Sequence, residues 1–439
     1  MDAPRQPLPS RPQGRSATTC VPIFNFSEPL MSNAQTSSPG SLASLPAAPV
    51  ASEANSWLAV LSVAFSAIVF CTTEFLPIGL LRYISSGMHV SEGTAGLMVT
   101  APGLLAAFAA PLIAIGVGRL DRRRVLLGLS ALLVLSNLVS MLATSFPVLI
   151  VGRVFFGIGL GGFWAVGAGI GGRLVAQKAV GRATSLIFAG VSIGMLLGGS
   201  GGALIGEMVG SRSAFGATLV LSVLAFVAQF VSLPRLPVAK RMPARELLGI
   251  VATPAGRVGL VAMLLVLCGQ FAAYTYVTPF LAQHAHFDAK AISAILLGYT
   301  LIGLVGNFIG GHVAGHSVKT TLATTIALFL VSVTLLPMLG DSQGWTLALV
   351  AGWGLAYGAM PLALQMWMAK AAPDAPEGGM ALFVANFQAS IALGSFVGGI
   401  VVDHLDVMDA LSIGGLLGVV ALVVLYAFNT TNAAPGARA

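Results

Sequence analysis

The sequence predicts an all-α polytopic membrane protein, with twelve transmembrane helices in two pseudo-symmetric six-helix halves. Charged residues make up only 8% of the 439 residues and hydrophobic residues 56%, whereas about 25% of the residues of a soluble domain are charged. Apolar runs of about 20 residues, the length that spans a bilayer as a helix, recur twelve times. Proline and glycine positions match between the first six runs and the last six, which indicates that the halves are repeats.

The segments follow one another with short joints. Residues 1–55 are rich in Pro, Ser and Ala, so we expect a disordered cytoplasmic tail there. The first half, 56–233, contains apolar runs at 57–81, 94–117, 125–143, 147–171, 182–206 and 213–233. A basic cytoplasmic linker at 234–256 separates it from the second half, 257–428. The runs of the second half are 257–282, 290–313, 320–339, 345–368, 379–402 and 408–428, followed by a cytoplasmic tail at 429–439.

Charge asymmetry predicts the orientation. With both termini in the cytoplasm, most Lys and Arg residues fall on the cytoplasmic side, and only Arg82, Arg212 and Lys290 lie outside. The acidic loop at 403–409 then also lies outside. We therefore expect a multi-pass membrane protein with both termini in the cytoplasm, and the net charge of +7 implies no nucleic-acid partner.

Glu74 is the only carboxylate inside an apolar run. A charge at bilayer depth costs about 2.5–3.5 kcal/mol on insertion scales, so such residues normally line a pathway or carry protons. We therefore predict that Glu74 is a proton-coupling residue. The alternative is a protonated glutamate that only packs helices.

Arg153 is the only basic residue buried in the same way, and it is the expected partner of Glu74. Burial would favour the protonated acid and a nearby guanidinium the carboxylate, so the two together would form a proton switch. The alternative is a structural arginine that pins neighbouring helices by binding backbone carbonyl groups.

Glycines recur every four residues in the fifth run. They are Gly190, Gly194, Gly198, Gly202 and Gly206. This spacing keeps them on one helix face, where another helix can approach closely. The functional hypothesis is that this face, with its counterpart at Ser390, Gly394 and Gly398, is where the two halves move against each other. The alternative is simple tight packing.

Amide and aromatic side chains interrupt the apolar helices of the second half. The predicted substrate-binding residues are Gln270, Tyr274, Tyr276, Asn307, Trp353, Tyr357 and Gln388, and Gln365 and Asn386 are of the same kind. Amides can pair with the edges of a base or ribose, and rings can stack on a base. The alternative for each is hydrogen bonding between helices. In the repeat alignment, which pairs Pro77 with Pro279, Tyr276 corresponds to Glu74 and Trp353 to Arg153, so the second half lacks the buried charges.

Three cysteines without metal-ligand spacing imply neither a metal site nor a cofactor. An enzyme is disfavoured because no cluster of catalytic side chains lies at membrane depth, and an ATP-driven pump because no phosphate-binding loop motif is present.

The loop after the second run contains Gly118, Asp121, Arg122 and Arg123. It could simply carry positive-inside charge or act as a gating loop. It resembles the loop signature of the major facilitator superfamily, although Val117 stands where the first glycine of that signature belongs.

Within the superfamily, the chain is similar to the drug-proton antiporter group and to its bacterial purine ribonucleoside efflux transporters. The matching stretches are Glu74-Phe-Leu-Pro77, Ser91-Glu-Gly-x-Ala-Gly96, Asp121-Arg-Arg123, Gly161-Gly-Phe-Trp-Ala165, and Gly269-Gln-Phe-Ala272 with Thr275-Tyr276. The resemblance implies this superfamily's fold and export of a small solute from the cytoplasm, driven by proton entry. We expect a monomer in the bacterial inner membrane. A multidrug or sugar exporter is the alternative, and a non-transporting membrane sensor a distant one.

Overall fold

The computed structural model describes residues 53–116, 120–167, 169–237, 244–373 and 376–427, all of which belong to one compact unit spanning 51–439. Within these ranges, twelve helices are long and apolar enough to cross a membrane. Many large apolar side chains on their outer faces are exposed, including Phe108, Leu112, Phe308 and Met338. Because lipid tails can cover such side chains, this exposure fits a polytopic membrane protein. The predicted tail at 429–439, most of the tail at 1–55 and Gly118 lie outside the described residues.

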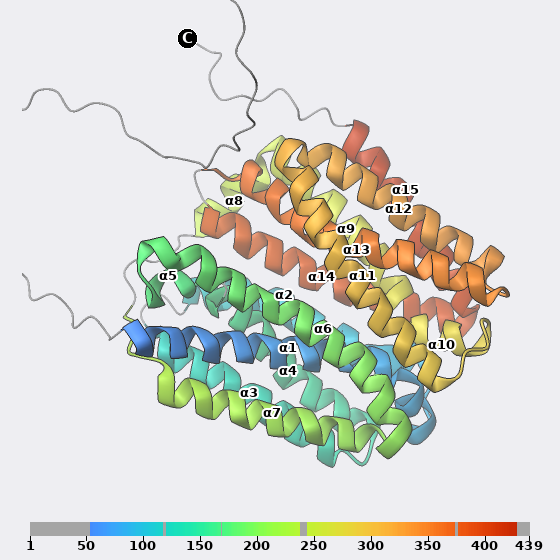
Figure 1. The fold of residues 1–439 in the computed structure, drawn as a ribbon, viewed down its shortest axis with the longest axis horizontal. Coiled ribbons are helices and arrows are strands. Elements are labelled where there is room, and N and C mark those ends of the chain that lie inside the picture. The colour runs from blue at the N-terminus through green and yellow to red at the C-terminus, as the bar shows by residue number, and fades with distance from the viewer. Residues whose placement is uncertain (1–52, 117–119, 168, 238–243, 374–375, 428–439) are drawn as a thin grey trace, which may run out of the picture. The chain divides into compact units, whose positions relative to one another are not determined.

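Six long helices form the first half (Figure 1). They are α1 (Glu53–Met88), α2 (Glu92–Gly116), α3 (Arg122–Leu142), α4 (Phe146–Gly167), α6 (Val180–Val209) and α7 (Ser211–Ser232), with the short helices α5 (Gly171–Leu174) and η1 (Gln177–Ala179) between α4 and α6. The second half contains α9 (Pro254–Tyr274), α10 (Val277–Gln283), α11 (Ala289–His316), α12 (Val318–Leu339), α13 (Gln343–Ala371), α14 (Pro376–His404) and α15 (Val407–Ala427).

The helices pack mainly within their own half. In the first half α1 packs on α6, α2 on α4, and α3 on α4 and α7. In the second half α11 packs on α13, α9 on α14 and α15, and α12 on α13 and α15. The principal contacts between the halves are those of α2 with α14 and of α6 with α11. We call the end of the bundle where α1 begins and α7 ends the linker end, and the opposite end the far end.

Two segments differ from the sequence expectation. The seventh run, expected as one helix, is interrupted between Tyr274 and Val277, where α9 ends and α10 begins. Pro279 has no N–H group to donate to the carbonyl group four residues earlier, which explains an interruption at this place. The linker, expected as a basic surface segment, contains a short helix, α8 (Ala244–Ala252).

The glycines of α6 lie against α1 of the same half. A Cβ atom at Gly194 would lie 2.6 Å from the carbonyl oxygen of Ile68, and one at Gly198 would lie 2.6 Å from that of Thr72. Their counterpart in α14 behaves alike, because a Cβ atom at Gly394 would lie 2.4 Å from the carbonyl oxygen of Cys268 in α9. The hypothesis that these faces move the halves against each other is therefore wrong, since each face joins two helices of one half. The close approach supports the tight-packing alternative.

The described part of the predicted gating loop also binds within its own half. The Asp121 carboxylate accepts hydrogen bonds from the backbone N–H groups of Arg123, at 2.9 Å, and Leu236, at 3.0 Å. The Arg123 guanidinium donates to the carbonyl oxygen of Phe230 at 2.8 Å. These contacts cap α3 and fasten the chain that follows α7; gating itself stays a prediction.

Candidate functional site

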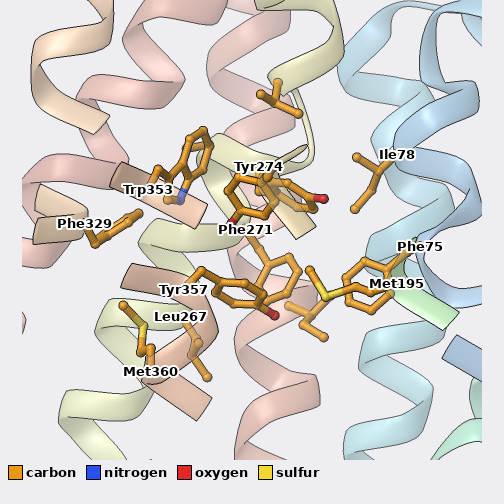
Figure 2. Packing of buried hydrophobic residues seen from close by; sticks show 14 of the residues in the cluster. Phe75, Ile78, Met195, Leu267, Phe271, Tyr274, Phe329, Trp353, Tyr357 and Met360 are labelled. Carbon is orange, nitrogen blue, oxygen red and sulfur yellow. The ribbon is translucent and has the colours of Figure 1, made fainter. Parts of the chain in front are cut away.

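A cavity of about 310 Å³ lies between the two halves. It is lined by α1, α4 and α6 of the first half and by α11, α13 and α14 of the second. Its polar side chains are Glu74, Ser192, Tyr299, Thr300, Asn307, Tyr357, Gln365 and Gln388, and its other aromatic rings are Phe75, Trp164, Phe188, Phe383 and Phe387. Figure 2 shows Tyr357 pointing from the second half toward Phe75 and Met195 of the first. The mixture of rings with a few polar groups is typical of a small-molecule site.

Glu74 and Gln388 connect the halves across this cavity. The Gln388 Nε2 atom donates a hydrogen bond of 3.0 Å to Glu74 Oε1, and both side chains are buried. Gln388 Oε1 is buried without a hydrogen-bond partner. Glu74, the one buried acidic residue in the part of the chain that the structure describes, therefore faces the cavity and contacts the opposite half.

The expected ion pair of Glu74 with Arg153 is absent. Among the described residues, the ion pair found is that of His284 with Asp406, at 3.3 Å. Arg153 is fully buried and binds backbone carbonyl groups of α1 and α2 instead. The alternative interpretation of Arg153, a structural arginine, fits these contacts better than a direct switch with Glu74.

Only some of the predicted substrate-binding residues reach the cavity. Asn307, Tyr357 and Gln388 line it, and so does Gln365. The lining excludes four predicted residues, Gln270, Tyr274, Tyr276 and Trp353.

Three of those four residues support a lining residue from behind. Trp353 Nε1 donates to Gln270 Oε1 at 2.7 Å, and Gln270 Nε2 donates to the hydroxyl group of Tyr299 at 3.0 Å. The ring of Tyr274 stacks on that of Tyr299, with centroids 4.9 Å apart. Tyr276 is separate from this network, because its hydroxyl group donates to the carbonyl oxygen of Ser395 at 2.9 Å.

Sequence reasoning missed the lining residues Tyr299, Trp164 and Phe188. Tyr299 carries the same signal as Tyr274, a polar ring inside an apolar run, and could have been found by it. Trp164 and Phe188 were missed because the substrate site was assigned to the second half, whereas the cavity draws on both.

The halves are hydrogen-bonded together at the far end. The Asp403 carboxylate at the end of α14 accepts from Ser91 Oγ at 2.6 Å and from the Gly93 N–H group at 2.9 Å, at the start of α2. Thr278 Oγ1 donates to the carbonyl oxygen of Ile78 at 3.0 Å. The cavity instead extends from Glu74 toward the linker end, where α6 and α14 begin. The structure is thus closed at one end.

We expect Asp403→Ala to loosen the far end, because the first turn of α2 loses its charged acceptor. In a variant without the native cysteines, Ile78→Cys serves as reporter, since Ile78 is buried and its carbonyl oxygen accepts the hydrogen bond from Thr278, the second contact between the halves at the far end. Asp403→Ala should increase its labelling by a membrane-impermeant maleimide severalfold. Asp409→Ala, which removes a carboxylate from the first turn of α15 nearby, is the control and should leave the labelling rate unchanged. Equal labelling rates in both variants would show that the Asp403 contact does not hold the far end closed.

Two six-helix halves around a central cavity, closed at one end, define a membrane transporter. The chain belongs to the major facilitator superfamily, whose family model matches residues 63–394 and 259–438. It is 33% identical over 369 residues to the purine ribonucleoside efflux pump NepI of Salmonella paratyphi A, covering 84% of this chain and 93% of that protein. The same pump of Salmonella typhi is similar to the same extent.

Solved structures share the fold at low sequence identity. The D-xylose-proton symporter superposes with a TM-score of 0.69 at 15% identity, over 86% of this chain and 98% of the other. The human organic anion transporter MFSD10 superposes with a TM-score of 0.63 at 18% identity, over 85% of this chain and all of the other.

Proposed function

We propose that this protein is a proton-coupled antiporter that exports purine ribonucleosides or their analogues. The observation that carries the proposal is the Glu74 carboxyl group, which lies in the central cavity and is hydrogen-bonded to Gln388 of the opposite half. A titratable group at that place can change the contact between the halves when it gains or loses a proton. Transport and coupling would then share one site.

The coupling follows from the chemistry of the Glu74 and Gln388 contact. A carboxylate accepts the hydrogen bond from Gln388 Nε2, whereas a protonated carboxyl group can also donate, for instance to the unpartnered Gln388 Oε1. Proton arrival from outside would change this contact, and release inside would restore it. Export should therefore increase as the outside becomes more acidic than the inside.

The cavity suits a nucleoside in size and in chemistry. Its volume of about 310 Å³ lies at the small end of ligand pockets, which are about 300–1,000 Å³. The rings of Tyr299, Tyr357 and Phe387 offer faces for a base, and Asn307 and Gln365 offer amides for its edge or for the ribose. The purine ribonucleoside pumps among the relatives support the same substrate class.

The orientation and the membrane remain part of the proposal. Charge asymmetry supports a cytoplasmic linker end, both termini inside and an inner-membrane location. The far end would then face the periplasm. The reporter Ile78→Cys tests this in cells, because an impermeant reagent should reach it only from the periplasmic side.

Flux in proteoliposomes tests the function. Radiolabelled inosine should accumulate only when a pH gradient is imposed, and uridine should compete poorly. Absence of gradient-dependent flux for every purine ribonucleoside would reject the assignment. Flux in which protons and inosine move in the same direction, as in a symporter, would reject antiport but not the substrate assignment.

A multidrug exporter is the second candidate, because most of the cavity surface is apolar or aromatic and carries a single carboxylate. Such a lining also suits a lipophilic cation. Competition decides between the two: a lipophilic cation that displaces inosine at lower concentration than adenosine does would favour the multidrug exporter.

Asn307→Leu should raise the KM for inosine about 2- to 12-fold with a smaller change in kcat, because one hydrogen bond contributes roughly 0.5–1.5 kcal/mol. Asn307 lines the cavity on α11, and its amide is engaged in none of the hydrogen bonds found among the described residues. Asn386→Leu is the control, since Asn386 instead binds the carbonyl oxygen of Leu260 at 2.9 Å. It should lower thermal stability and leave KM unchanged; a KM shift in the control but not in Asn307→Leu would contradict the site.

A further inference from the structure

Two prolines leave backbone carbonyl groups without their helical donors beside the cavity. In an α-helix the N–H group of residue i donates to the carbonyl oxygen of residue i−4, and proline has no N–H group. Pro77 lies inside α1 and Pro102 inside α2. The carbonyl groups concerned are therefore those of Thr73 and Met98. At membrane depth an unsatisfied carbonyl group is costly, so each needs another donor.

Arg153 of α4 donates to both of these carbonyl groups. Its Nη1 atom lies 3.0 Å from Thr73 O, and its Nε atom lies 2.9 Å from Met98 O. The guanidinium is fully buried and lies over the ring of Phe156, with its Cζ atom 4.4 Å from the ring centroid. One side chain thus replaces two missing N–H groups on two different helices.

Close packing of α4 against α2 brings Arg153 within reach of the Met98 carbonyl group. A Cβ atom at Gly157 would lie only 2.5 Å from the carbonyl oxygen of Pro102, so α4 and α2 are in close contact there. Arg153 lies one turn before Gly157, as Met98 lies one turn before Pro102. The close contact therefore places Arg153 beside the freed carbonyl group.

The second half provides an internal comparison. Pro279 aligns with Pro77, and Trp353 stands in the position of Arg153. Trp353 donates its single N–H group to Gln270 and offers no guanidinium to the backbone. There the helix is interrupted, between Tyr274 and Val277, whereas α1 continues through Pro77. The intact helix occurs in the half that contains the arginine.

We propose that Arg153 is a positioning residue, which holds α1 and α2 against α4 by capping the carbonyl groups that Pro77 and Pro102 leave free. Because Thr73 immediately precedes Glu74, this cap holds Glu74 at the cavity within reach of Gln388. The capping stands on the contacts alone, and the effect on Glu74 rests on the proposed function. The role requires donors directed at the backbone and no ion pair with Glu74.

Restoring the missing N–H groups tests the cap without reference to transport. Arg153→Met should lower the Tm of the purified full-length protein by several degrees. In a variant that also carries Pro77→Ala and Pro102→Ala, Arg153→Met should lower the Tm by less than half as much. The alanine N–H groups can then donate to the carbonyl groups of Thr73 and Met98. Pro111→Ala, which changes another proline of α2, is the control background and should leave the full loss. Equal losses in all backgrounds would overturn the proposal.

If Arg153→Met cannot be purified alone, Arg153→Gln takes its place and the yield of folded protein in the same backgrounds becomes the readout. Recovery only in the background that carries both Pro77→Ala and Pro102→Ala supports the cap. No recovery there overturns it.

The pH dependence of inosine binding tests the effect on Glu74. Arg153→Met should shift the pH midpoint, and the triple variant with Pro77→Ala and Pro102→Ala should return it toward the native value although the charge is still missing. A midpoint that stays shifted in the triple variant means that the charge of Arg153 acts on Glu74 directly, which overturns positioning. An unshifted midpoint in Arg153→Met also overturns it. If the native protein does not bind inosine, the proposed function fails while the stability experiment still decides the cap.

Discussion

Glu74→Gln is expected to abolish pH-driven export, with inosine accumulation falling to the level of vesicles without protein. Glutamine keeps the size of the side chain and can still accept from Gln388, so the variant should fold and insert normally. It cannot release a proton, however, and so it mimics one protonation state permanently. Binding and exchange of nucleoside without a gradient should persist. Flux in proteoliposomes with and without an imposed pH gradient measures both properties.

Glu207→Gln is the matched control for this experiment. Glu207 accepts a hydrogen bond of 2.8 Å from the hydroxyl group of Tyr83 near the far end, and it does not line the central cavity. It should leave gradient-driven flux unchanged. The coupling role of Glu74 would be abandoned if Glu74→Gln, expressed at native levels, still concentrated inosine with unchanged pH dependence.

Among the variants proposed for this protein, Gly198→Leu is expected to lower the yield of folded protein the most. Even a Cβ atom at Gly198 would lie 2.6 Å from the carbonyl oxygen of Thr72 and 3.0 Å from the Cβ atom of Phe75. Overpacking a core costs about 1–3 kcal/mol, and more where the obstacle is backbone, as here. Because this contact joins α1 to α6 within one half, the substitution should prevent assembly of that half and not merely stop turnover. The amount of monodisperse protein after detergent extraction measures the loss.

Gly201→Leu, three residues further along the same helix, is the control. A Cβ atom at Gly201 would have nothing within 4 Å, so this variant should fold and transport like the native protein. A normal yield of Gly198→Leu would show that the close contact of α6 with α1 does not require glycine at this position. Poor yield of both variants would show that α6 cannot tolerate leucine for reasons unrelated to its contact with α1.

The sequence predicted the transmembrane helices because their determinant is local. A run of about 20 apolar residues must form a helix in a bilayer to satisfy its own backbone, and the helices lie where the runs were predicted, apart from the interruption after Tyr274. The same logic singled out Glu74, since a carboxylate at that depth needs a reason to be there. The structure places it in the cavity.

The sequence could not predict which residues contact one another across helices. Glycine spacing shows that α6 has a face for close approach, but it does not tell which helix approaches, and the structure selects α1 of the same half. In the same way, Trp353 and Gln270 could be recognised from the sequence as polar groups inside apolar runs. Their direction, toward Tyr299 and not into the cavity, depends on the rotation of three helices about their own axes.

By itself the sequence determined the number of spans, the repeat of the two halves and the presence of one buried acid and one buried base, because each is a matter of composition along the chain. Only the tertiary structure decided that Glu74 contacts Gln388 and that Arg153 binds the carbonyl groups left free by Pro77 and Pro102. The sequence favoured an ion pair because opposite charges attract. A buried guanidinium is also stabilised, however, by donating to carbonyl oxygens that lack another donor. Which acceptors it meets is set by how α1, α2 and α4 pack.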